Sequence, residues 1–263
     1  MSDAADCTPD RTAGHALLQG KRILISGGAR GLGRAFGEAC RREGAQVVLA
    51  DILHAEGRAS ADALAAQFVP LDLAEPSSIE ACVQQSVTLL GGLDGLVNCG
   101  AITNSGGRNL DQLEIDTWDQ VMTVNVRGSW LMSRAALPAL RAARAQGGGR
   151  IVNIASDTAL WGAPRLMAYV ASKGALISMT RSMARELGSW DITVNTFWPG
   201  VTKTEIERPS VPAEVFDRMT QMQSIKRLTH TDDLAHGVMF LCSDDASFIT
   251  GQSLQVDGGL TFI

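Results

Sequence analysis

The sequence predicts an α/β fold, in which one doubly wound parallel sheet carries helices on both faces. Short apolar runs alternate with helix-like segments along the chain, which is typical of such a sheet. The runs are apolar throughout, as expected when helices cover both faces of the strands. The chain has 263 residues and no linker that divides it, so we expect a single domain.

The expected elements follow one another at regular intervals. We expect strands at residues 21–26, 46–50, 67–71, 95–98, 150–155, 192–196 and 253–256. We expect helices at residues 34–43, 55–66, 77–90, 117–145, 168–187 and 231–242. Residues 1–19 are interpreted as a polar N-terminal extension of the domain 20–263. The stretch 201–228 follows a strand, has mixed polarity and contains two prolines, so it is a candidate substrate lid.

Composition excludes several classes of function. The chain has 23 Lys and Arg against 28 Asp and Glu, and its net charge of −5 argues against binding to nucleic acid. No apolar run approaches the roughly 20 residues of a membrane helix. The N-terminus lacks the basic and apolar regions of a secretory signal, so we expect a cytoplasmic protein. The five cysteines and four histidines are scattered, so neither a disulfide framework nor a metal site is expected.

A glycine-rich turn, SGGARGLG at residues 26–33, directly follows the first expected strand. Gly27, Gly31 and Gly33 permit a tight turn and a close approach of the backbone to a ligand. The helix that follows presents free N–H groups and a positive dipole end, which suit a pyrophosphate. Asp51 ends the second strand 20 residues after Gly31, the spacing of the ribose-binding carboxylate in a Rossmann fold. We therefore predict a dinucleotide site that includes Leu32, rather than a plain turn.

The same region bears on which dinucleotide binds. A carboxylate at Asp51 accepts a hydrogen bond from a ribose 2′-hydroxyl and repels a 2′-phosphate. The adjacent Ile52 supplies no cation. Arg30, in the glycine turn, could instead pair with a 2′-phosphate. These residues favour NAD and leave NADP as the alternative.

Two further strand ends supply candidate cofactor contacts. Asp72 and Leu73 follow the third strand, where the carboxylate could bind the adenine amino group or simply cap a turn. Asn98 and Gly100 end the fourth strand, where small residues would let the backbone pass beneath the cofactor.

Tyr169 and Lys173 are one helical turn apart and share a helix face. A nearby ammonium favours the phenolate form of a tyrosine, so this phenol can exchange a proton with an alcohol or a carbonyl oxygen near neutral pH. Ser156 ends the fifth strand, at the sheet edge where ligands bind in open α/β sheets. Its hydroxyl could hold the substrate oxygen beside Tyr169.

These residues together resemble the classical short-chain dehydrogenase/reductase family over about residues 20–263. The family's TGxxxGxG pattern fits the glycine turn, with serine in place of threonine. The resemblance implies that Asn125, Ser156, Tyr169 and Lys173 form the family's catalytic tetrad. It also implies that Lys173 binds the nicotinamide ribose and that Asn125 holds a water that relays protons to Lys173. An alternative role for Asn125 is to satisfy backbone groups at a helix kink.

The resemblance extends to the segment after the sixth strand. Pro199 and Gly200 match the family's PG motif, and it implies that the backbone near Thr202 and the Thr204 hydroxyl bind the nicotinamide carboxamide. One motif departs from the pattern, because residues 98–101 read NCGA where the family usually has NNAG.

The substrate pocket is expected to include Ser156, Thr158, Trp161 and Trp198, although the tryptophans could instead pack the core. Asp157 could repel anions or orient a hydroxyl. We predict an NAD(H)-dependent oxidoreductase that interconverts a secondary alcohol and a ketone, with an apolar, aromatic or alicyclic substrate. The alternatives are an NADPH-dependent 3-oxoacyl-carrier-protein or carbonyl reductase and, less favoured, a non-catalytic dinucleotide-binding regulator.

The helix that carries Tyr169 also predicts self-association. Its other side presents small residues that permit close packing against a second subunit: Ala171, Gly174, Ala175, Ser178 and Ser182. Members of the resembled family are usually tetramers or dimers, so a homo-oligomer, most simply a tetramer, is implied.

Overall fold

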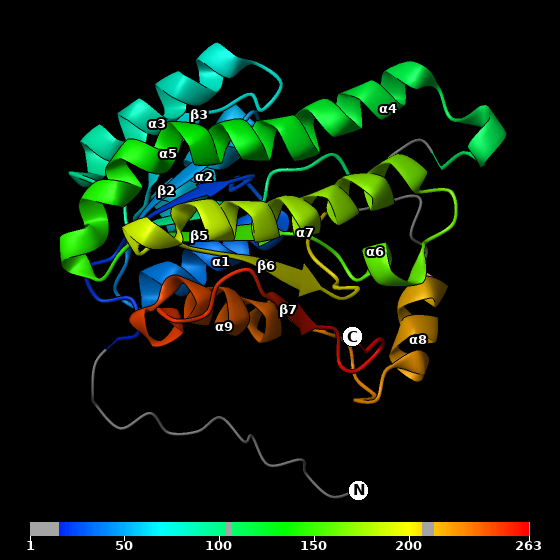
Figure 1. Ribbon diagram of the computed structural model, residues 1–263. Coiled ribbons are helices and arrows are strands. Elements are labelled where there is room, and N and C mark those ends of the chain that lie inside the picture. Colours follow the sequence, from blue (N-terminus) through cyan, green and yellow to red (C-terminus); the bar gives the residue numbers. More distant parts are fainter. Residues whose placement is uncertain (1–15, 104–106, 207–212, 263) are drawn as a thin grey trace, which may run out of the picture.

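Seven parallel strands form one sheet at the centre of the protein (Figure 1). The computed structural model describes residues 16–103, 107–206 and 213–262. The sheet order is β3-β2-β1-β4-β5-β6-β7. The strands are β1 Arg22–Ser26, β2 Gln46–Asp51, β3 Gln67–Pro70, β4 Gly95–Asn98, β5 Arg150–Ile154, β6 Thr193–Pro199 and β7 Ser253–Val256. The predicted doubly wound parallel sheet is confirmed.

Helices cover both faces of this sheet (Figure 1). One face packs against α1 Gly31–Arg42, α2 His54–Ala63 and α9 Thr231–Cys242. The other face packs against α3 Pro76–Leu90, α5 Ser129–Ala142 and α7 Met167–Leu187. The two faces therefore bury separate apolar clusters, which explains why the strands are apolar on both sides.

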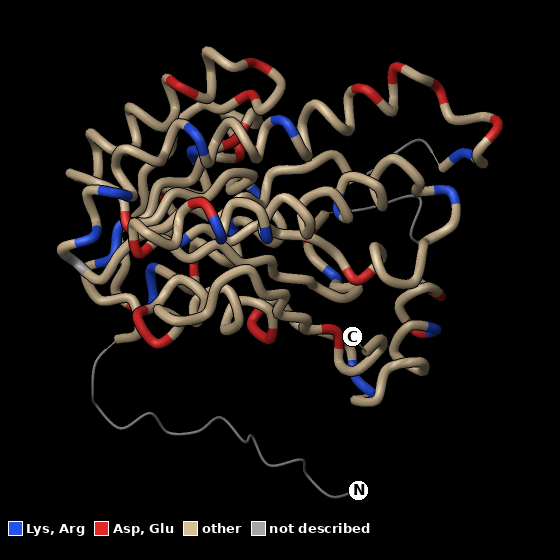
Figure 2. Tube along the Cα trace, viewed as in Figure 1, with Lys and Arg blue, Asp and Glu red and all other residues tan. Residues whose placement is uncertain are grey.

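Figure 2 shows both basic and acidic residues spread over the chain, with acidic residues along α4 and basic residues along α5. Within the described ranges, no helix combines the length and the apolar character needed to cross a membrane. The same ranges contain no group of three or more His, Cys, Asp or Glu side chains that could hold a metal ion.

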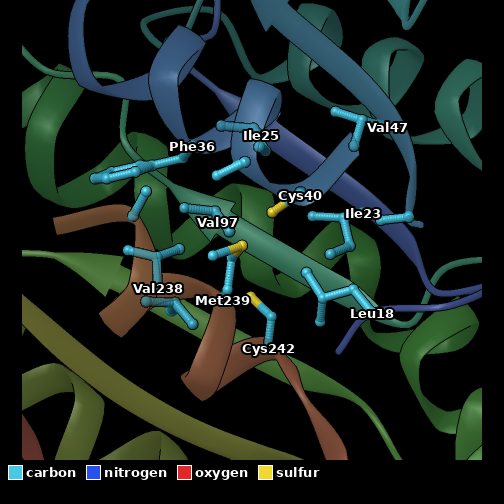
Figure 3. Close-up of a cluster of buried hydrophobic side chains, with 14 of the residues drawn as sticks. Leu18, Ile23, Ile25, Phe36, Cys40, Val47, Val97, Val238, Met239 and Cys242 are labelled. Carbon is cyan, nitrogen blue, oxygen red and sulfur yellow. The ribbon is translucent and has the colours of Figure 1, made fainter. Parts of the chain in front are cut away.

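The apolar cluster beneath α1 shows how the sheet is held (Figure 3). Phe36 of α1 meets Ile25 of β1, Val97 of β4 and Val238 of α9. Leu18 is fully buried in the same cluster. The domain therefore begins before residue 20, because Leu18 is packed in its core. Residues 1–15 of the predicted extension lie outside the described part of the chain.

The predicted helix 117–145 is divided in the structure. It consists of α4 Ile115–Met122, a π-helical turn Thr123–Gly128 and α5. The π turn interrupts the regular α-helix, and Asn125 within it hydrogen bonds to the backbone of Ile102. Short 3₁₀ turns occupy Leu110–Gln112, Ala143–Gln146, Gly188–Trp190 and Asp244–Ala246.

Two described helices were not predicted. The short helix α6 Thr158–Trp161 follows β5, and α8 Ala213–Met222 lies inside the candidate lid. In Figure 1, α8 stands outside the helical layers. The lid residues 207–212, with both prolines, lie outside the described part of the chain. After α8 the chain returns to the body of the protein, because the buried Gln223 donates to the Asp257 carbonyl at 3.0 Å.

Strand order positions the site. β1 and β4 are neighbours in the sheet, with Ser26 paired to Asn98. In the sequence, β2 and β3 come between these two strands, and both lie on the other side of β1. The connections therefore leave in opposite directions at this point, and the carboxyl ends of β1 and β4 border an open crevice. The glycine turn lies at this crevice because it directly follows β1.

Candidate active site

The turn after β1 requires glycine at two positions. Gly27 has a φ of 71°, and a Cβ there would come within 2.5 Å of the Gly100 Cα atom. A Cβ at Gly33 would collide with the carbonyl oxygen of Gly27. The turn is held by a 2.8 Å hydrogen bond from the Gly27 N–H to the Ala50 carbonyl. A smooth backbone cradle thus lies against the first residues of α1, as a pyrophosphate requires.

The carboxylate of Asp51 is fixed beside this cradle. Its Oδ2 accepts a 3.0 Å hydrogen bond from the Ala29 N–H, and its Oδ1 accepts a 3.1 Å bond from the Leu53 N–H. The neighbouring Ile52 is 59 % exposed. Arg30 is exposed and forms no ion pair with the described residues. The structure therefore presents an anion, oriented by two backbone groups, at the position predicted to meet the ribose.

Two predicted adenine contacts have roles in the fold. The Asp72 Oδ1 accepts a 2.8 Å hydrogen bond from the Ala74 N–H, which is the turn-capping alternative. Leu73 is buried, and its side chain lies against Gly100. Asp72 and Leu73 therefore stabilise the turns that border the crevice. Binding of adenine by Asp72 stays a prediction.

Asn98 points into the protein interior. Its Nδ2 donates to the Asn153 Oδ1 at 2.8 Å and to the Ser133 Oγ at 3.1 Å. Asn153 in turn donates to the Thr180 Oγ1 of α7 at 2.8 Å. The Asn98 side chain therefore links β4, β5, α5 and α7, and any contact with a cofactor at this position would come from the backbone.

Lys173 and Tyr169 lie together on α7. The Lys173 Nζ is 5.5 Å from the centre of the Tyr169 ring and donates a 2.7 Å hydrogen bond to the Ile154 carbonyl. Lys173 is only 3 % exposed. Burial lowers the pKa of Lys173 to about 8, and the nearby Cys99 opposes this shift. Lys173 is therefore a cation whose charge is lost just above neutral pH.

Asn125 connects the loop after β4 to α7. Its Oδ1 accepts from the Ile102 N–H at 2.8 Å, and its Nδ2 donates to the Ile102 carbonyl at 3.0 Å and to the Ser172 Oγ at 3.0 Å. Ser172 precedes Lys173, so Asn125 lies beside the helix that carries the proposed proton donor. These bonds match the helix-kink role, and the water-relay role stays a prediction.

Ser156 is surrounded by polar groups at the end of β5. Its Oγ accepts hydrogen bonds from the Thr158 N–H at 3.2 Å and the Thr158 Oγ1 at 2.9 Å. It donates to the Asp157 Oδ1 at 3.3 Å. Trp161, at the end of α6, is 37 % exposed. The structure thus brings Ser156 and Thr158 into direct contact, with Trp161 one helical turn along.

The structure does not support the predicted place of Trp198 in the substrate pocket. Its side chain is 3 % exposed, and its indole N–H donates to the Thr196 Oγ1 at 2.8 Å. It lines a surface hollow together with Arg181 and Arg185 of α7. Arg181 lies 12 residues beyond Tyr169, or about 18 Å along the helix axis. The side chain of Trp198 therefore faces a part of α7 remote from the catalytic groups.

The segment after β6 starts on the sheet and then leaves it. The Gly200 N–H donates to the Val256 carbonyl at 3.0 Å, and the Thr202 Oγ1 donates to the Gly200 carbonyl at 3.0 Å. Pro199 is the last residue of β6. The Thr204 Oγ1 accepts from the Ile206 N–H at 3.3 Å. Binding of nicotinamide by this segment stays a prediction.

Glu205 is a residue that the sequence analysis missed. Its Oε1 accepts a 2.7 Å hydrogen bond from the Gly31 N–H at the start of α1. The Ile206 Cδ1 lies 2.6 Å from where a Cβ of Gly31 would stand. The lid segment therefore meets the phosphate cradle. The two contacting positions are 174 residues apart, so no local pattern could have indicated this contact.

Known proteins resemble this chain along almost its whole length. Residues 27–261 match a family profile described as enoyl-(acyl carrier protein) reductase. A 3-alpha-(or 20-beta)-hydroxysteroid dehydrogenase of Mycobacterium tuberculosis (strain CDC 1551 / Oshkosh) is 38 % identical over 244 residues, which cover 92 % of this chain and 90 % of that protein.

Two solved structures have the same fold. A short chain dehydrogenase from Burkholderia cenocepacia J2315 in complex with NADP has a TM-score of 0.82 and 34 % identity, covering 93 % of this chain and 99 % of the other. A 3-ketoacyl-(acyl-carrier-protein) reductase from Brucella melitensis complexed with NADH has a TM-score of 0.86 and 33 % identity, covering 93 % of this chain and 100 % of the other. With this match along almost its whole length, the chain belongs to the classical short-chain dehydrogenase/reductase family and is an oxidoreductase of that family.

Proposed function

We propose that the protein is an NAD(H)-dependent dehydrogenase that interconverts a secondary alcohol and a ketone. The observation that carries the proposal is the buried Lys173 ammonium, 5.5 Å from the Tyr169 ring, at the sheet edge that also holds Ser156. A bound nicotinamide dinucleotide supplies or accepts the hydride in this chemistry. The glycine turn fits such a group because glycine at Gly27 and Gly33, where a Cβ would collide with neighbouring backbone, keeps the turn tight against the start of α1.

The side chains divide the proton chemistry between them. Tyr169 takes the hydroxyl proton of the alcohol during oxidation and returns it to the oxygen during reduction. Lys173 is charged below its pKa of about 8, so over that range it favours the phenolate form of Tyr169. Ser156 donates its hydroxyl to the substrate oxygen, which requires that it release Asp157. Asn125 holds the loop after β4 against α7 and so keeps Lys173 in place.

NAD is the proposed cofactor because of Asp51. Two backbone N–H groups orient this carboxylate, and an oriented anion favours a ribose 2′-hydroxyl over a 2′-phosphate. The alternative is an NADPH-dependent 3-oxoacyl-carrier-protein or carbonyl reductase, and the exposed Arg30 is the observation that favours it. A non-catalytic regulator does not explain why Lys173 is buried beside the only tyrosine of the chain, although burial destabilises its charged form.

The proposed substrate is apolar, aromatic or alicyclic. Three large apolar side chains near Ser156 and Tyr169 are partly open to solvent: Leu160 is 40 %, Trp161 37 % and Met167 39 % exposed. They lie on α6 and at the start of α7, which pack against each other. Similarity to a hydroxysteroid dehydrogenase points to the same class of ring-bearing alcohol.

The test is a panel of cyclic and aryl alcohols assayed with NAD and NADP, with reduced nicotinamide followed by its absorbance. We expect Tyr169→Phe to lower kcat at least 10²-fold, because the proton donor is removed. Its Kd for NADH, measured by fluorescence, should stay within about twofold of the wild-type value. Normal turnover by Tyr169→Phe would reject the mechanism, and higher kcat/KM with NADP would reject the cofactor assignment.

We also propose a homo-oligomer, most simply a tetramer. Gly174 on α7 has open space around its Cα, and Ile115 and Trp130 on the neighbouring helices are 76 % and 46 % exposed. Exposed large apolar side chains and a helix face of small residues suit a subunit interface. Light scattering at micromolar concentration should give a multiple of 27.9 kDa, and a monomer would reject the proposal.

A further inference from the structure

A buried acidic side chain stands directly beside the catalytic serine. Asp157 is 1 % exposed. Its Oδ1 accepts the hydrogen bond of the Ser156 hydroxyl at 3.3 Å. Its Oδ2 is buried and has no hydrogen-bond partner among the residues that the structure describes. A carboxyl group in such surroundings is costly to bury, which suggests a functional reason for it.

The groups that face Asp157 leave its charge uncompensated. Ser156 approaches from the end of β5, the Thr158 backbone and Trp161 approach from α6, and Asp257 approaches from the end of β7. None of these groups is a cation, and the Asp257 carboxylate is itself held by the N–H groups that follow it. Burial raises the pKa of Asp157 to about 6, hydrogen bonds oppose this, and the Asp257 charge adds to it. At pH 7 and above the Asp157 side chain is therefore an anion in the wall of the site that hydrogen bonds partly offset and that none of these groups neutralises.

We propose that Asp157 determines specificity by charge: it disfavours substrates with an anionic group near the reacting carbon and favours substrates that are neutral or cationic there. This inference rests on the proposed function. The substrate oxygen would lie about 2.7 Å from the Ser156 Oγ, the usual length of such a hydrogen bond. The Asp157 Oδ1 is 3.3 Å from the same atom on its own side, so the carboxyl and the reacting oxygen are within about 6 Å.

The effect acts through the electric field rather than through contact. The Asp157 side chain is buried even without a substrate, so a substrate hydroxyl cannot reach its free oxygen. Charges about 6 Å apart in a partly buried site still interact appreciably, because little water screens them. A carboxylate or phosphate on the carbon next to the carbinol would meet this field. An ammonium group at the same position would be attracted.

The experiment compares three secondary alcohols with one ring: 2-hydroxycyclohexanecarboxylate, 2-methylcyclohexanol and 2-aminocyclohexanol, which are anionic, neutral and cationic. For each we measure kcat/KM with NAD between pH 5.5 and 8.5. At each pH the ratio of two substrates cancels the ionisations of Tyr169 and Lys173, because all three use both residues. We expect the anion-to-neutral ratio to fall about tenfold as the pH rises through 6, and the cation-to-neutral ratio to rise.

Asp157→Asn should abolish these trends. The amide keeps the size of the side chain and an acceptor for Ser156 but cannot ionise. In this variant we expect both ratios to be independent of pH, with the anionic substrate about tenfold better relative to the neutral one than in the wild type at pH 8. Asp62→Asn is the matched control, since it removes one exposed carboxylate from the distant end of α2 and should leave both ratios unchanged.

The outcomes separate this inference from the proposed function. Flat ratios in the wild-type enzyme, or an Asp157→Asn variant that keeps the wild-type ratios, would overturn the role of Asp157. The wild-type profile needs no variant, so it decides the point even if Asp157→Asn fails to fold. If none of the three alcohols is oxidised, the proposed function fails instead. Binding of the three compounds to the enzyme–NADH complex, followed by NADH fluorescence, then tests the same charge preference without turnover.

Discussion

The two halves of the site differ in how they are held. The cofactor half comprises the glycine turn with Asp51, Asn98, Asn125 and Lys173, whose side chains are buried or bound by several hydrogen bonds. The substrate half comprises α6 and the first residues of α7, where the large side chains of Leu160, Trp161 and Met167 are partly open to solvent. The side chains proposed for cofactor binding and proton transfer are buried or held by hydrogen bonds, whereas the apolar side chains proposed to contact the substrate are partly exposed. Substitutions should therefore have larger effects in the cofactor half.

The largest effect is expected for Gly33→Ala in the cofactor half. Its new methyl group would collide with the Gly27 carbonyl, and backbone cannot yield as a flexible side chain can. We expect NADH binding to be lost in fluorescence titration and the free energy of unfolding to fall by about 1–3 kcal/mol in urea denaturation. Gly188→Ala is the control, because a Cβ there meets nothing within 4 Å. Equal affinities for NADH in the two variants would contradict a rigid cradle.

Lys173→Met should separate activity from stability. We expect kcat to fall by about 10²–10³-fold, because the phenolate of Tyr169 loses its cation. The pKa of Lys173 in the folded protein is about 8, below its ordinary value of 10.5. Between these values the unfolded chain binds more protons, so the stability of the wild type rises with pH there and is lost as the pH falls through 8.

The variant has no such dependence at this position. The Tm of Lys173→Met relative to the wild type should therefore be highest below pH 8 and should decline as the pH rises from about 8 to 10.5. Differential scanning calorimetry across this range measures the difference directly. A difference independent of pH would mean that Lys173 is not buried as a cation.

Asp51→Asn should change cofactor preference by an intermediate amount. Removing the charge weakens the hydrogen bond to a ribose hydroxyl and ends the repulsion of a 2′-phosphate. We expect the ratio of Kd values for NADPH and NADH to fall about tenfold, measured by fluorescence titration of both cofactors. Arg30→Gln is the companion variant, and its Kd for NADH should change less than twofold. If Arg30→Gln alone controls the ratio, Asp51 does not select the cofactor.

The smallest effect is expected for Glu205→Gln, in the lid segment that meets the glycine turn. The Glu205 carboxylate occupies the Gly31 N–H at the helix N-terminus, where a cofactor phosphate must compete with it. Removing this anion should lower the Kd for NADH by about two- to fivefold, the equivalent of up to about 1 kcal/mol at a helix end. Glu214→Gln on α8 is the exposed control. Weaker binding by Glu205→Gln would show that the carboxylate assists the cofactor rather than competing with it.

Local spacing made much of the fold and of the cofactor half predictable. The alternation of apolar runs and helical segments indicated the doubly wound sheet, because each strand must bury both faces. The glycine turn and Asp51 were recognisable because their roles depend on backbone geometry and on a short interval along the chain. Tyr169 and Lys173 could be paired because one helical turn separates them.

Other features depend on which residues meet across the fold. Trp198 was assigned to the substrate pocket from its place near a strand end, but alternation along β6 directs its side chain to the hollow beside Arg181. The π turn between α4 and α5 places Asn125 where its side chain bonds to the backbone of Ile102, 23 residues earlier in the chain.

By itself, the sequence determined the fold class and the family, and it supplied the proposed proton-transfer pair Tyr169 and Lys173, because these follow from periodicity and short intervals. Only the tertiary structure decided that Asp157 is buried without a cation and that Glu205 lies on the phosphate cradle. The reason is physical: burial and long-range contact depend on the packing of all neighbouring elements. The sequence shows which residues are carboxylates, but the effect of a carboxylate on a ligand depends on the groups that surround it in the folded protein.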